Sequence, residues 1–563
     1  MLFLNIGVII ILYIFAFLWR KNMKLNVKRL VSLALTSAVT VCSLAINGNA
    51  ASTTTTITSV NFTNDGTYLS SIYAGCTTVH VDAGIDQRGN VKFFRNGTEL
   101  EAGARVATGD TIKLYRNNSV RQTLSIVVSG DVTCDGTVSA ADLLYTQMAV
   151  LGINSLEGAP LMAAKISGGA SLSATDLVTM RQYVLGIGTP TVMDGFYNSD
   201  GYINAVPVYV GTPAFERYDN SAADIIFARN PWDMQTYNGK VYIGSGDYNS
   251  NKAPSLIACY DPKTDEATVY QDLLDDEQVS NFAIINGRLI AAGIDPSNNA
   301  ILHYFELNAD ETAFINYAMP YDWRVHNFDM IGFGDKIFIG AGTDSQKNRT
   351  AALVSTDGGK TFGSVNVVKD GMNVTGANIG SGWDRVYQYL TLNGDLYCYE
   401  VHVGDSSYDG FYKYDADANQ FNFHSAGSGF VSTGDKFFNI FKESMEFAGK
   451  SVICTGYFLT TSDMKSFSKK TFAGSNASYL DMVVIGDELY VLAATGSSGS
   501  YTNTVYKTKD LSTFTKVLEF DAETYMISME YVDGTFVFGA GAPSNTTSPS
   551  TMCGDIFRVR VDF

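Results

Sequence analysis

The sequence predicts a mainly β protein that consists of an N-terminal β-sandwich module, a small α-helical module and a C-terminal seven-bladed β-propeller. Three observations predict this fold class. Residues 51–130 alternate apolar and polar side chains in short runs separated by Gly and Asn, which is typical of half-buried strands. A segment of 15 residues occurs twice within residues 131–188, and an apolar hairpin pattern occurs seven times within residues 205–563. Residues 189–204 are interpreted as a linker.

Composition narrows the class of protein. The chain has 563 residues, a net charge of −18 and 12% aromatic residues, with 52 Gly against 11 Pro. This length indicates several domains, and abundant Tyr, Phe and Gly favour β-sheets joined by tight turns. The negative charge argues against binding of nucleic acid through a surface that neutralises phosphates.

Two apolar stretches open the chain. The second, within residues 23–50, has a basic segment, an apolar run from Leu30 to Ile46, and small residues before a cleavage site expected after Ala50. This is the pattern of a secretory signal peptide, so we expect a secreted protein. Residues 1–22 are interpreted as an extension produced by a start codon set too early, with Met23 as the initiator. The alternative is a membrane anchor at residues 2–19, a stretch of marginal length for a span.

Six cysteines follow the signal peptide, and their spacing matches no zinc or redox motif. Cys259 and Cys398 lie in apolar runs that resemble strands. We therefore expect most of the six to be buried free thiols.

The duplicated segment follows a loop with oxygen-bearing residues. Ser139–Ile153 aligns with Ser173–Ile187 at an offset of 34 residues, and 8 of the 15 aligned positions are identical. In the first copy, four side chains and one carbonyl fall at loop positions 1, 3, 5, 12 and 7, and Gly136 at position 6 permits the sharp turn that a calcium loop needs. In loop order these candidate calcium ligands are Asp131, Thr133, Asp135, Thr137 (through its carbonyl) and Asp142.

Residues 131–188 resemble a type I dockerin, the duplicated calcium-binding module that attaches enzymes to a cohesin domain of a scaffoldin in a cellulosome. The resemblance implies Ca²⁺ as a cofactor and a cohesin as a partner. The second copy departs from the pattern, because Lys165 and Gly169 replace two carboxylates, so we expect one calcium ion, in the first copy. The residues that the resemblance places against the cohesin are Ala140, Ala141, Ala174 and Thr175. The Ig-like module at 51–130 resembles modules that precede dockerins, and we expect it to be a spacer.

The C-terminal repeat consists of two apolar strands joined by a short turn rich in Gly, Asn and Asp. Most of its copies are 47 to 59 residues apart, the spacing of four-stranded propeller blades. The copies are residues 233–243, 281–290, 329–339, 388–397, 445–453, 481–490 and 528–537. Residues 355–362 match the Asp-box of sialidase-like propellers, a structural turn, and 461–467 and 508–514 are weaker versions. Residues 202–210 are expected to supply the fourth strand of the last blade.

One rim of the predicted ring collects the polar and aromatic candidates. The loops that enter the innermost strands and those that leave the second strands share this face. Trp faces stack on sugars, and carboxylate pairs cleave glycosidic bonds. The candidates for substrate binding are Trp232, Tyr248, Trp323, Arg324, His326, Trp383 and Arg385. The candidate catalytic residues are Asp233, Asp247, Asp329, Asp344, Asp384 and Glu400.

Structural roles compete with these assignments. Each Trp could fill the core between blades, and Asp233, Asp329 and Asp481, which occupy the same position of the repeat, could form hydrogen bonds between blades. The sialidase arginine triad, a nucleophile motif, a phosphate loop and a metal-binding His pair are not evident in the sequence.

The predicted function is that of a secreted cellulosome component whose propeller acts on plant cell-wall polysaccharide as an O-glycosyl hydrolase. A non-catalytic propeller that binds carbohydrate is the first alternative. A propeller that binds another protein is the second. The analogy to other dockerin-bearing chains favours the enzyme, but the analogy is not evidence from the site itself.

Overall fold

The computed structural model describes residues 55–185, 187, 194–219, 222–247, 250–296, 302–319, 324–343, 351–374, 383–403, 405–431, 444–542 and 549–561. The predicted extra segment at 1–22 and the predicted signal peptide at 23–50 lie outside these residues. Among the helices of the described part, none combines the length and the apolar character needed to cross a bilayer. The mainly β fold class is confirmed.

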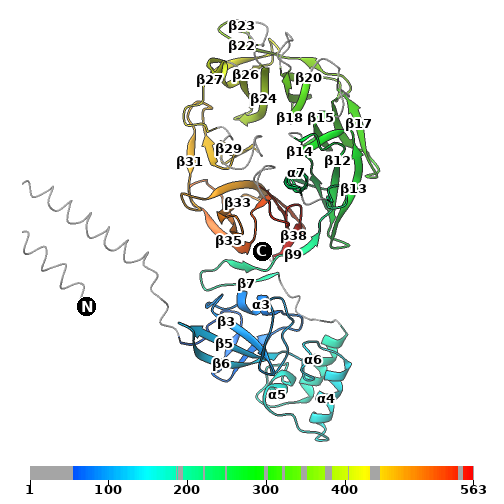
Figure 1. Cartoon of the computed structure of the whole chain (residues 1–563), viewed down its shortest axis with the longest axis vertical. Coiled ribbons are helices and arrows are strands. Elements are labelled where there is room, and N and C mark those ends of the chain that lie inside the picture. Colours follow the sequence, from blue (N-terminus) through cyan, green and yellow to red (C-terminus); the bar gives the residue numbers. More distant parts are fainter. Residues whose placement is uncertain are drawn as a thin grey trace, which may run out of the picture. The chain divides into compact units, whose positions relative to one another are not determined.

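Seven four-stranded blades occupy the described residues from 208 onward, as the repeated hairpins predict. Figure 1 shows them following one another around a ring, from green through yellow and orange to red. In each blade the repeated hairpin supplies the innermost strand and the second strand. Single ladder pairs, Ile294 with His326 and Gly342 with Arg385, also connect blades 2, 3 and 4 into one hydrogen-bonded sheet.

The strands are assigned as follows, from the innermost outward. Blade 1 has β10 (Asp233–Tyr237), β11 (Lys240–Gly244), β12 (Ser255–Asp261) and β13 (Glu266–Leu274); blade 2 has β14 (Asp276–Ile285), β15 (Arg288–Pro296), β16 (His303–Leu307) and β17 (Phe314–Ala318). Blade 3 has β18 (Arg324–Phe333), β19 (Lys336–Thr343), β20 (Ala352–Ser355) and β21 (Gly363–Ser364); blade 4 has β24 (Trp383–Leu392), β25 (Asp395–Val403), β26 (Gly410–Asp415) and β27 (Gln420–Ser425), extended by β22 (Asn366–Lys369) and β23 (Met372–Asn373). Blade 5 has β28 (Ser444–Phe447), β29 (Lys450–Cys454), β30 (Phe458–Thr461) and β31 (Ser468–Lys470); blade 6 has β32 (Ser478–Ile485), β33 (Glu488–Ser497), β34 (Ser500–Thr508) and β35 (Thr515–Ala522). Blade 7 has β36 (Met526–Val532), β37 (Thr535–Ala540), β38 (Ile556–Arg560) and β9 (Val208–Gly211). Two short helices complete this part, α7 (Ala223–Phe227) and the 3₁₀ helix η3 (Ser406–Tyr408).

The hairpin turns have the geometry that Asn-Gly sequences favour. Asn238 and Gly239 have φ of 47° and 78°, and Asn393 and Gly394 have φ of 54° and 79°. Two consecutive left-handed residues make a type I′ turn, whose twist matches the twist of the paired strands. The turns therefore set the register of the innermost hairpins from local sequence.

The last blade is closed by sequence from the start of the propeller. Strand β9 pairs with β38, so the expected closure is confirmed, although the strand is Val208–Gly211 instead of 202–210. Residues 203–205 form β8 (Ile203–Ala205), which pairs with β7 (Gly195–Tyr197) and, in parallel, with β35 of blade 6. Part of the predicted linker at 189–204 is thus a β-hairpin. The composition of this segment favours turns, but its backbone forms hydrogen bonds with β35, and these hold it as a strand.

An ion pair network reinforces this closure. Arg558 in β38 is 6% exposed and its guanidinium bonds Asp194 and, at 2.7 Å, Asp265 of blade 1. Hydrogen bonding to Arg558 lowers the pKa of the Asp265 carboxyl below its usual value. The bidentate geometry is the strong form of this pairing.

Carboxylates join neighbouring blades close to the axis. Asp233 accepts a hydrogen bond from the backbone N–H of Phe282 at 2.7 Å, and Asp329 accepts one from Tyr389 at 2.6 Å. Asp481 does the same for Met529 at 2.7 Å. In each case the acceptor lies on one innermost strand and the donor on the innermost strand of the next blade. These are the hydrogen bonds between blades that the repeat predicts for these aspartates.

Aromatic side chains fill the space between blades. The largest fully buried residues are all Tyr or Phe, including Tyr242, Tyr304 and Phe338. For example, Phe338 of blade 3 packs against Tyr414 of blade 4 with ring centroids 4.9 Å apart. Each such ring removes on the order of 150–250 Å² from water, which explains the high aromatic content.

The Asp-box turns connect the third and fourth strands of blades 3, 5 and 6, as predicted. In blade 3, Asp357 accepts hydrogen bonds from Thr361 N–H at 2.9 Å and from the Ser355 hydroxyl at 2.8 Å. Phe362 packs edge-on against Tyr304 of blade 2. Hydrogen bonds from Thr361 lower the pKa of the Asp357 carboxyl to about 2.

The module at 57–128 is mainly β, but its described strands form a single six-stranded sheet instead of the two sheets of a sandwich. The sheet order is β1 (Thr63–Asn64), β2 (Tyr68–Ile72), β6 (Ser119–Val128), β5 (Thr111–Arg116), β3 (Val91–Arg95) and β4 (Thr98–Glu99). The run at 77–81, expected to be a strand, is instead helix α3 (Thr78–Ala83). A capping box between Thr77 and His80 begins the helix, and the buried residues Thr78 and Val81 have helical spacing.

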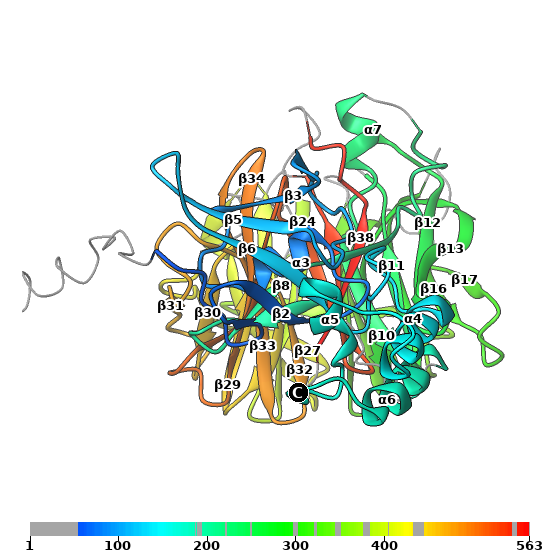
Figure 2. The ribbon, with the colours of Figure 1, turned by 90° about the horizontal axis from the view of Figure 1, so that it is seen from below.

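The helical module has α4 (Ala140–Val150), α5 (Gly158–Ala164) and α6 (Ala174–Val184), and Figure 2 shows α4 and α6 side by side. Both long helices begin with a Ser–Asp capping box, Ser139 with Asp142 and Ser173 with Asp176. The six cysteines at positions 76 to 553 are free thiols, and those other than Cys134 are buried, as expected.

Asp481→Ala is expected to destabilise the propeller by about 1–3 kcal/mol, because the Met529 N–H loses its acceptor in a buried position. Chemical denaturation monitored by circular dichroism measures this loss. Asp310→Ala, at an exposed position of blade 2, serves as the matched control and is expected to change stability by less than about 0.5 kcal/mol. Equal effects of the two substitutions would contradict a role for Asp481 between blades.

Candidate functional site

Two acidic residues lie opposite each other in the ladder of β14 and β15 at the rim of blade 2. The register of β14 and β15 pairs Asp276 with Pro296 and Gln278 with Ile294, which places Glu277 directly opposite Asp295. Directly opposite residues of an antiparallel pair have Cβ atoms about 4.5–5.5 Å apart. Glu277 is 4% exposed, and the Asp295 side chain is 24% exposed. Like charges in this arrangement would repel, so the pair is not explained by the stability of the sheet.

The environment makes Glu277 a weak acid. Burial, followed by the negative charges of Asp295, Asp247 and Asp276, raises the pKa of Glu277 to about 8. Its Oε2 atom is buried and has no hydrogen-bond partner among the residues that the structure describes. Glu277 is therefore protonated at neutral pH and can donate a proton.

Asp295 is held by a neighbouring blade. The Nδ1 atom of His326, on the innermost strand of blade 3, lies 2.9 Å from Asp295 Oδ1, within ion-pair distance. Asp295 also has a φ of 51°, a left-handed conformation that few non-glycine residues adopt. Unusual backbone conformations of this kind cluster at functional sites.

A second acid lies beside the pair. Asp276 is fully buried and its Oδ1 atom lies 3.0 Å from Nδ1 of His303 on β16. The hydrogen bond to Asp276 raises the pKa of His303, and burial raises the pKa of Asp276. Asp247 is also fully buried, and its backbone N–H donates to the carbonyl of Glu277 at 3.1 Å. The segment that follows β11 of blade 1 is thus bonded to the rim of blade 2 at Glu277.

This arrangement has the chemistry of a general acid and a carboxylate base. Two carboxyl groups in unlike environments separate into one that is protonated and one that is charged, which is how acid and base roles are divided in glycoside-cleaving sites. Glu277 is the protonated member, and Asp295 is the more accessible one.

A second cluster of acids lies within blade 4. His402 Nδ1 bonds Asp384 Oδ1 at 2.7 Å, and the His402 N–H donates to Asp409 at 2.8 Å. Glu400 is fully buried, and within the described part of the chain neither of its carboxyl oxygens has a hydrogen-bond partner. Burial, followed by Asp384 and Asp409, raises the pKa of Glu400 well above its usual value.

At the position of Glu400, each of the six remaining blades has a small residue. Counted from the hairpin turn, the equivalent residues are Ser245, Gly293, Ala341, Thr455, Ala493 and Ala540. The predicted candidates Asp384 and Glu400 are therefore brought together, but both are 0% exposed. Neither carboxyl is in contact with solvent in this conformation.

The other predicted rim residues are placed as follows. Asp233 and Asp329 point between blades, and burial raises the pKa of Asp329 to about 7. Arg385 lies with its guanidinium carbon 5.7 Å from the Phe328 ring. Asp344, Tyr248 and Trp323, and the side chains of Arg324 and Trp383, lie outside the described residues.

Trp232 supports the core-filling alternative. It is 9% exposed, packs edge-on against Phe227 at 5.2 Å, and donates its indole N–H to the carbonyl of Gly246 at 2.7 Å. Both the ring and its polar atom are used inside the fold. A sugar would find little of this ring to stack on.

Glu277 was not among the residues selected from sequence. The available signal is the acidic run Asp275-Asp276-Glu277, which directly precedes the second repeated hairpin. Acidic runs are common on solvated surfaces, so the run alone does not distinguish a buried acid from an exposed one.

The first loop of the helical module offers the oxygen donors that Ca²⁺ prefers. Asp131 and Asp142 are both fully buried. Burial raises the pKa of Asp131, and so does the charge of Asp142, although hydrogen bonds from backbone N–H groups act in the opposite direction. Asp142 accepts hydrogen bonds from the N–H groups of Val132 and Thr133 at 2.9 and 2.8 Å. Asp135 accepts one from the Thr137 N–H at 2.8 Å.

A calcium ion fits this donor set, because it would offset the repulsion between buried carboxylates. Within the described part of the chain, no three His, Cys, Asp or Glu side chains already converge on one point. Ion binding would therefore replace some of the hydrogen bonds between the carboxylates and backbone N–H groups. The second loop does not fit, since Asp176 is its one carboxylate among positions 1, 3, 5 and 12.

Exposed large apolar side chains lie on α4 and α6 and just after the C-terminal end of each helix. They are Leu144, Tyr145, Leu151, Ile153, Val178, Leu185 and Ile187, which are between 49% and 65% exposed. Three pairs are equivalent in the duplicated sequence, Leu144 with Val178, Leu151 with Leu185 and Ile153 with Ile187. The residues expected to contact a cohesin, Ala140, Ala141, Ala174 and Thr175, are exposed in the first turns of the same helices. We refer to the seven exposed apolar residues, from Leu144 to Ile187, as the α4/α6 face.

Comparisons with known proteins leave the family open. No protein-family model and no curated protein matches the sequence. Among solved structures, the chain is similar to the extracellular domain of BT4673 from B. thetaiotaomicron, with 10% identity over 66% of this chain and 46% of that one and a TM-score of 0.40. It is also similar to a PL25 ulvan lyase (10% identity, 63% and 94% coverage, TM-score 0.36) and to BamB from Moraxella catarrhalis (11%, 58% and 83%, 0.31). Similarity at this level does not assign a function.

Glu277→Gln is expected to flatten the pH dependence of stability. Because the pKa of Glu277 rises from 4.5 to about 8 on folding, the folded state binds one more proton in this interval. Its stabilising contribution is complete below pH 4.5 and is lost as pH rises to about 8, with a slope of at most about 1.4 kcal/mol per pH unit. Denaturant unfolding at pH 5 to 9 measures the slope, and an unchanged slope in the variant would contradict the assignment.

Proposed function

We propose that this is a secreted protein of polysaccharide breakdown, in which the helical module docks onto a cohesin and the propeller cleaves glycosidic bonds at the rim of blade 2. The single observation that carries the catalytic part is the pairing of protonated Glu277 with Asp295. The two groups come from adjacent strands, and the partial exposure of Asp295 gives access from solvent.

Each side chain has a role in this proposal. Glu277 donates its proton to the leaving oxygen as general acid, and Asp295 acts as base or nucleophile. His326 positions Asp295 through the contact at 2.9 Å. A pKa near 8 keeps Glu277 protonated over the neutral range, which is the state that a general acid requires.

The docking part is supported by the α4/α6 face. Clusters of exposed large apolar side chains often mark a site of protein interaction. The face repeats across the duplicated segment, so the two copies present similar side chains to a partner. The resemblance to type I dockerins implies a cohesin as the partner, and the first loop is proposed to hold one calcium ion.

Activity on polysaccharide tests the catalytic part. The purified chain is incubated with plant glucans, xyloglucan, xylan and pectin, and released reducing ends and unsaturated products are measured. Glu277→Gln and Asp295→Asn are each expected to lower turnover at least about 100-fold, because each removes one of the two proton-transfer roles. The rate of the wild-type chain is expected to fall above about pH 8, where Glu277 loses its proton.

Glu266→Gln is the matched control, since Glu266 is exposed on β13 of blade 1. Binding of a glycan without any product would contradict the catalytic role and support the non-catalytic alternative. Full activity of Glu277→Gln would exclude Glu277 as the acid and direct attention to blade 4.

Cohesin binding tests the docking part. Replacing Leu144 and Val178 together by Glu is expected to weaken binding at least about 100-fold in calorimetric titration against a panel of cohesins, because both copies lose an apolar contact at the centre of the face. Val484→Glu, at a position that is 45% exposed on the propeller, is the control for added charge. Unchanged affinity of the double variant would place the partner elsewhere.

A further inference from the structure

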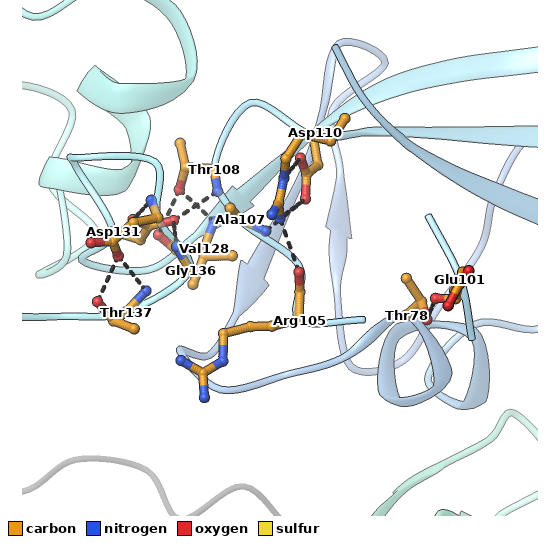
Figure 3. Close-up of polar contacts among 12 residues, drawn as sticks. Thr78, Glu101, Arg105, Ala107, Thr108, Asp110, Val128, Asp131, Gly136 and Thr137 are labelled. Carbon is orange, nitrogen blue, oxygen red and sulfur yellow. Dashed lines mark hydrogen bonds and ion pairs between the residues drawn. The ribbon is translucent and has the colours of Figure 1, made fainter. Parts of the chain in front are cut away.

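The first loop of the helical module is bonded to the neighbouring β module. The backbone N–H of Thr108 donates to Asp131 Oδ2 at 2.8 Å, and the N–H of Gly136 donates to the same oxygen at 3.1 Å (Figure 3). Asp131 is the residue at position 1 of the loop. One of its two oxygens is therefore shared between the loop and a group that lies outside the loop.

Thr108 is itself held firmly. Its hydroxyl accepts a hydrogen bond from the Val128 N–H at 3.1 Å and donates to the Val128 carbonyl at 3.2 Å. Val128 ends β6, three residues before Asp131. The hydroxyl thus fixes the Thr108 peptide against the strand that leads directly into the loop.

Hydrogen bonds to Arg95 and Asp110 hold the segment around Thr108 in place. Arg95 binds Asp110 through two hydrogen bonds, at 2.8 and 2.7 Å, and also donates to the carbonyl of Arg105 at 2.9 Å. The N–H of Ala107 donates to the same carboxyl of Asp110 at 2.8 Å. Figure 3 shows Asp110, Ala107 and Thr108 in one continuous polar network that ends on Asp131.

The two modules also touch at Gly136. A Cβ atom on this residue would lie 2.7 Å from the Val106 carbonyl oxygen, so only glycine allows the approach. Gly136 has a φ of 80°, which glycine adopts freely. The contact places residues 105–108 directly against the loop.

We propose that Thr108 is a positioning residue for the calcium site. Its peptide N–H fixes the Asp131 carboxyl through Oδ2. Oδ1 accepts a hydrogen bond from the Asp135 N–H of the loop at 2.9 Å and is thereby directed toward the loop that would hold the ion. The affinity for Ca²⁺ then depends on a module that does not contain the loop. This inference rests on the proposed calcium binding. By thermodynamic linkage, Ca²⁺ must stabilise the 105–110 segment by the same factor.

Calcium titration of the full chain tests the role of Thr108. Thr108→Val keeps the N–H but removes both bonds to Val128, and it is expected to weaken Ca²⁺ binding about 3- to 10-fold. Thr108→Ser, which retains the hydroxyl, is expected to bind as the wild type does. Thr78→Val is the matched control, because Thr78 is a buried threonine of the same module whose hydroxyl bonds Glu101 and Gly103 instead of the loop.

Hydrogen exchange on the wild-type chain supplies a readout that does not require a variant to fold. Addition of Ca²⁺ is expected to slow exchange of amides within residues 105–110, and Asp135→Ala is expected to abolish this effect. Exchange in the hairpin turn at 486–487 serves as an internal control. Unchanged exchange at 105–110 with Ca²⁺ bound, or equal affinity of Thr108→Val and wild type, would overturn the role of Thr108. Failure of the wild-type chain to bind Ca²⁺ would instead overturn the proposed calcium site.

Discussion

The propeller depends on hydrogen bonds that link one blade to the next close to the axis. An innermost strand has a ladder partner on one side only, so alternate N–H groups on its free edge need another acceptor. Asp233, Asp329 and Asp481 supply that acceptor for the following blade. The receiving strands of blades 2, 4 and 7 each have a register shift just before the donor residue, a bulge that locally disrupts the ladder. Single ladder pairs link blades 2, 3 and 4, but the longer ladders run within blades, so these hydrogen bonds and the aromatic packing hold the ring together.

At the rim, the innermost hairpins of different blades have different polar residues at the same position. Blade 4 pairs Asp384 with His402 across its innermost hairpin, a complementary pair with a direct bond. Blade 2 places Glu277 opposite Asp295 at the equivalent position, where the two carboxyls oppose each other. The cost of this pairing appears as the raised pKa of Glu277, which burial and the neighbouring acids produce. A stable scaffold can hold such a pair, and perturbed acids of this kind are typical of functional sites.

The helical module shows how a duplicated segment keeps its fold after one copy has lost its ligand set. Asp176 accepts hydrogen bonds from the N–H groups of Ser167 and Ser173, just as Asp142 does from those of Thr133 and Ser139. This network needs neither the carboxylate at position 1 nor the one at position 5. The second loop can therefore have Lys165 and Gly169 without unfolding. The first loop is in addition bonded to the β module that precedes it, through Asp131.

Local sequence determined the parts of this protein that depend on short-range geometry. The turns rich in Gly, Asn and Asp, the Asp-box turns and the recurring aspartates were all evident from spacing, because each acts within a few residues or at a fixed position of a repeat. The closing strand was also predicted, although its exact residues were not. Residues 77–81 show the limit, since a short alternating run fits a strand, yet a capping box and burial on one side make it a helix.

Tertiary structure decided which acidic side chains are buried and which charged groups surround them. Sequence could place Glu400 near a rim, but burial and neighbours from other strands distinguish the pair of Glu277 with the partly exposed Asp295 from the enclosed cluster at Glu400. It likewise decided that Trp232 is used by the core and that Thr108, far from any motif, touches the loop at Asp131. Periodicity and spacing report on neighbours along the chain, whereas desolvation and charge depend on residues that only folding brings together.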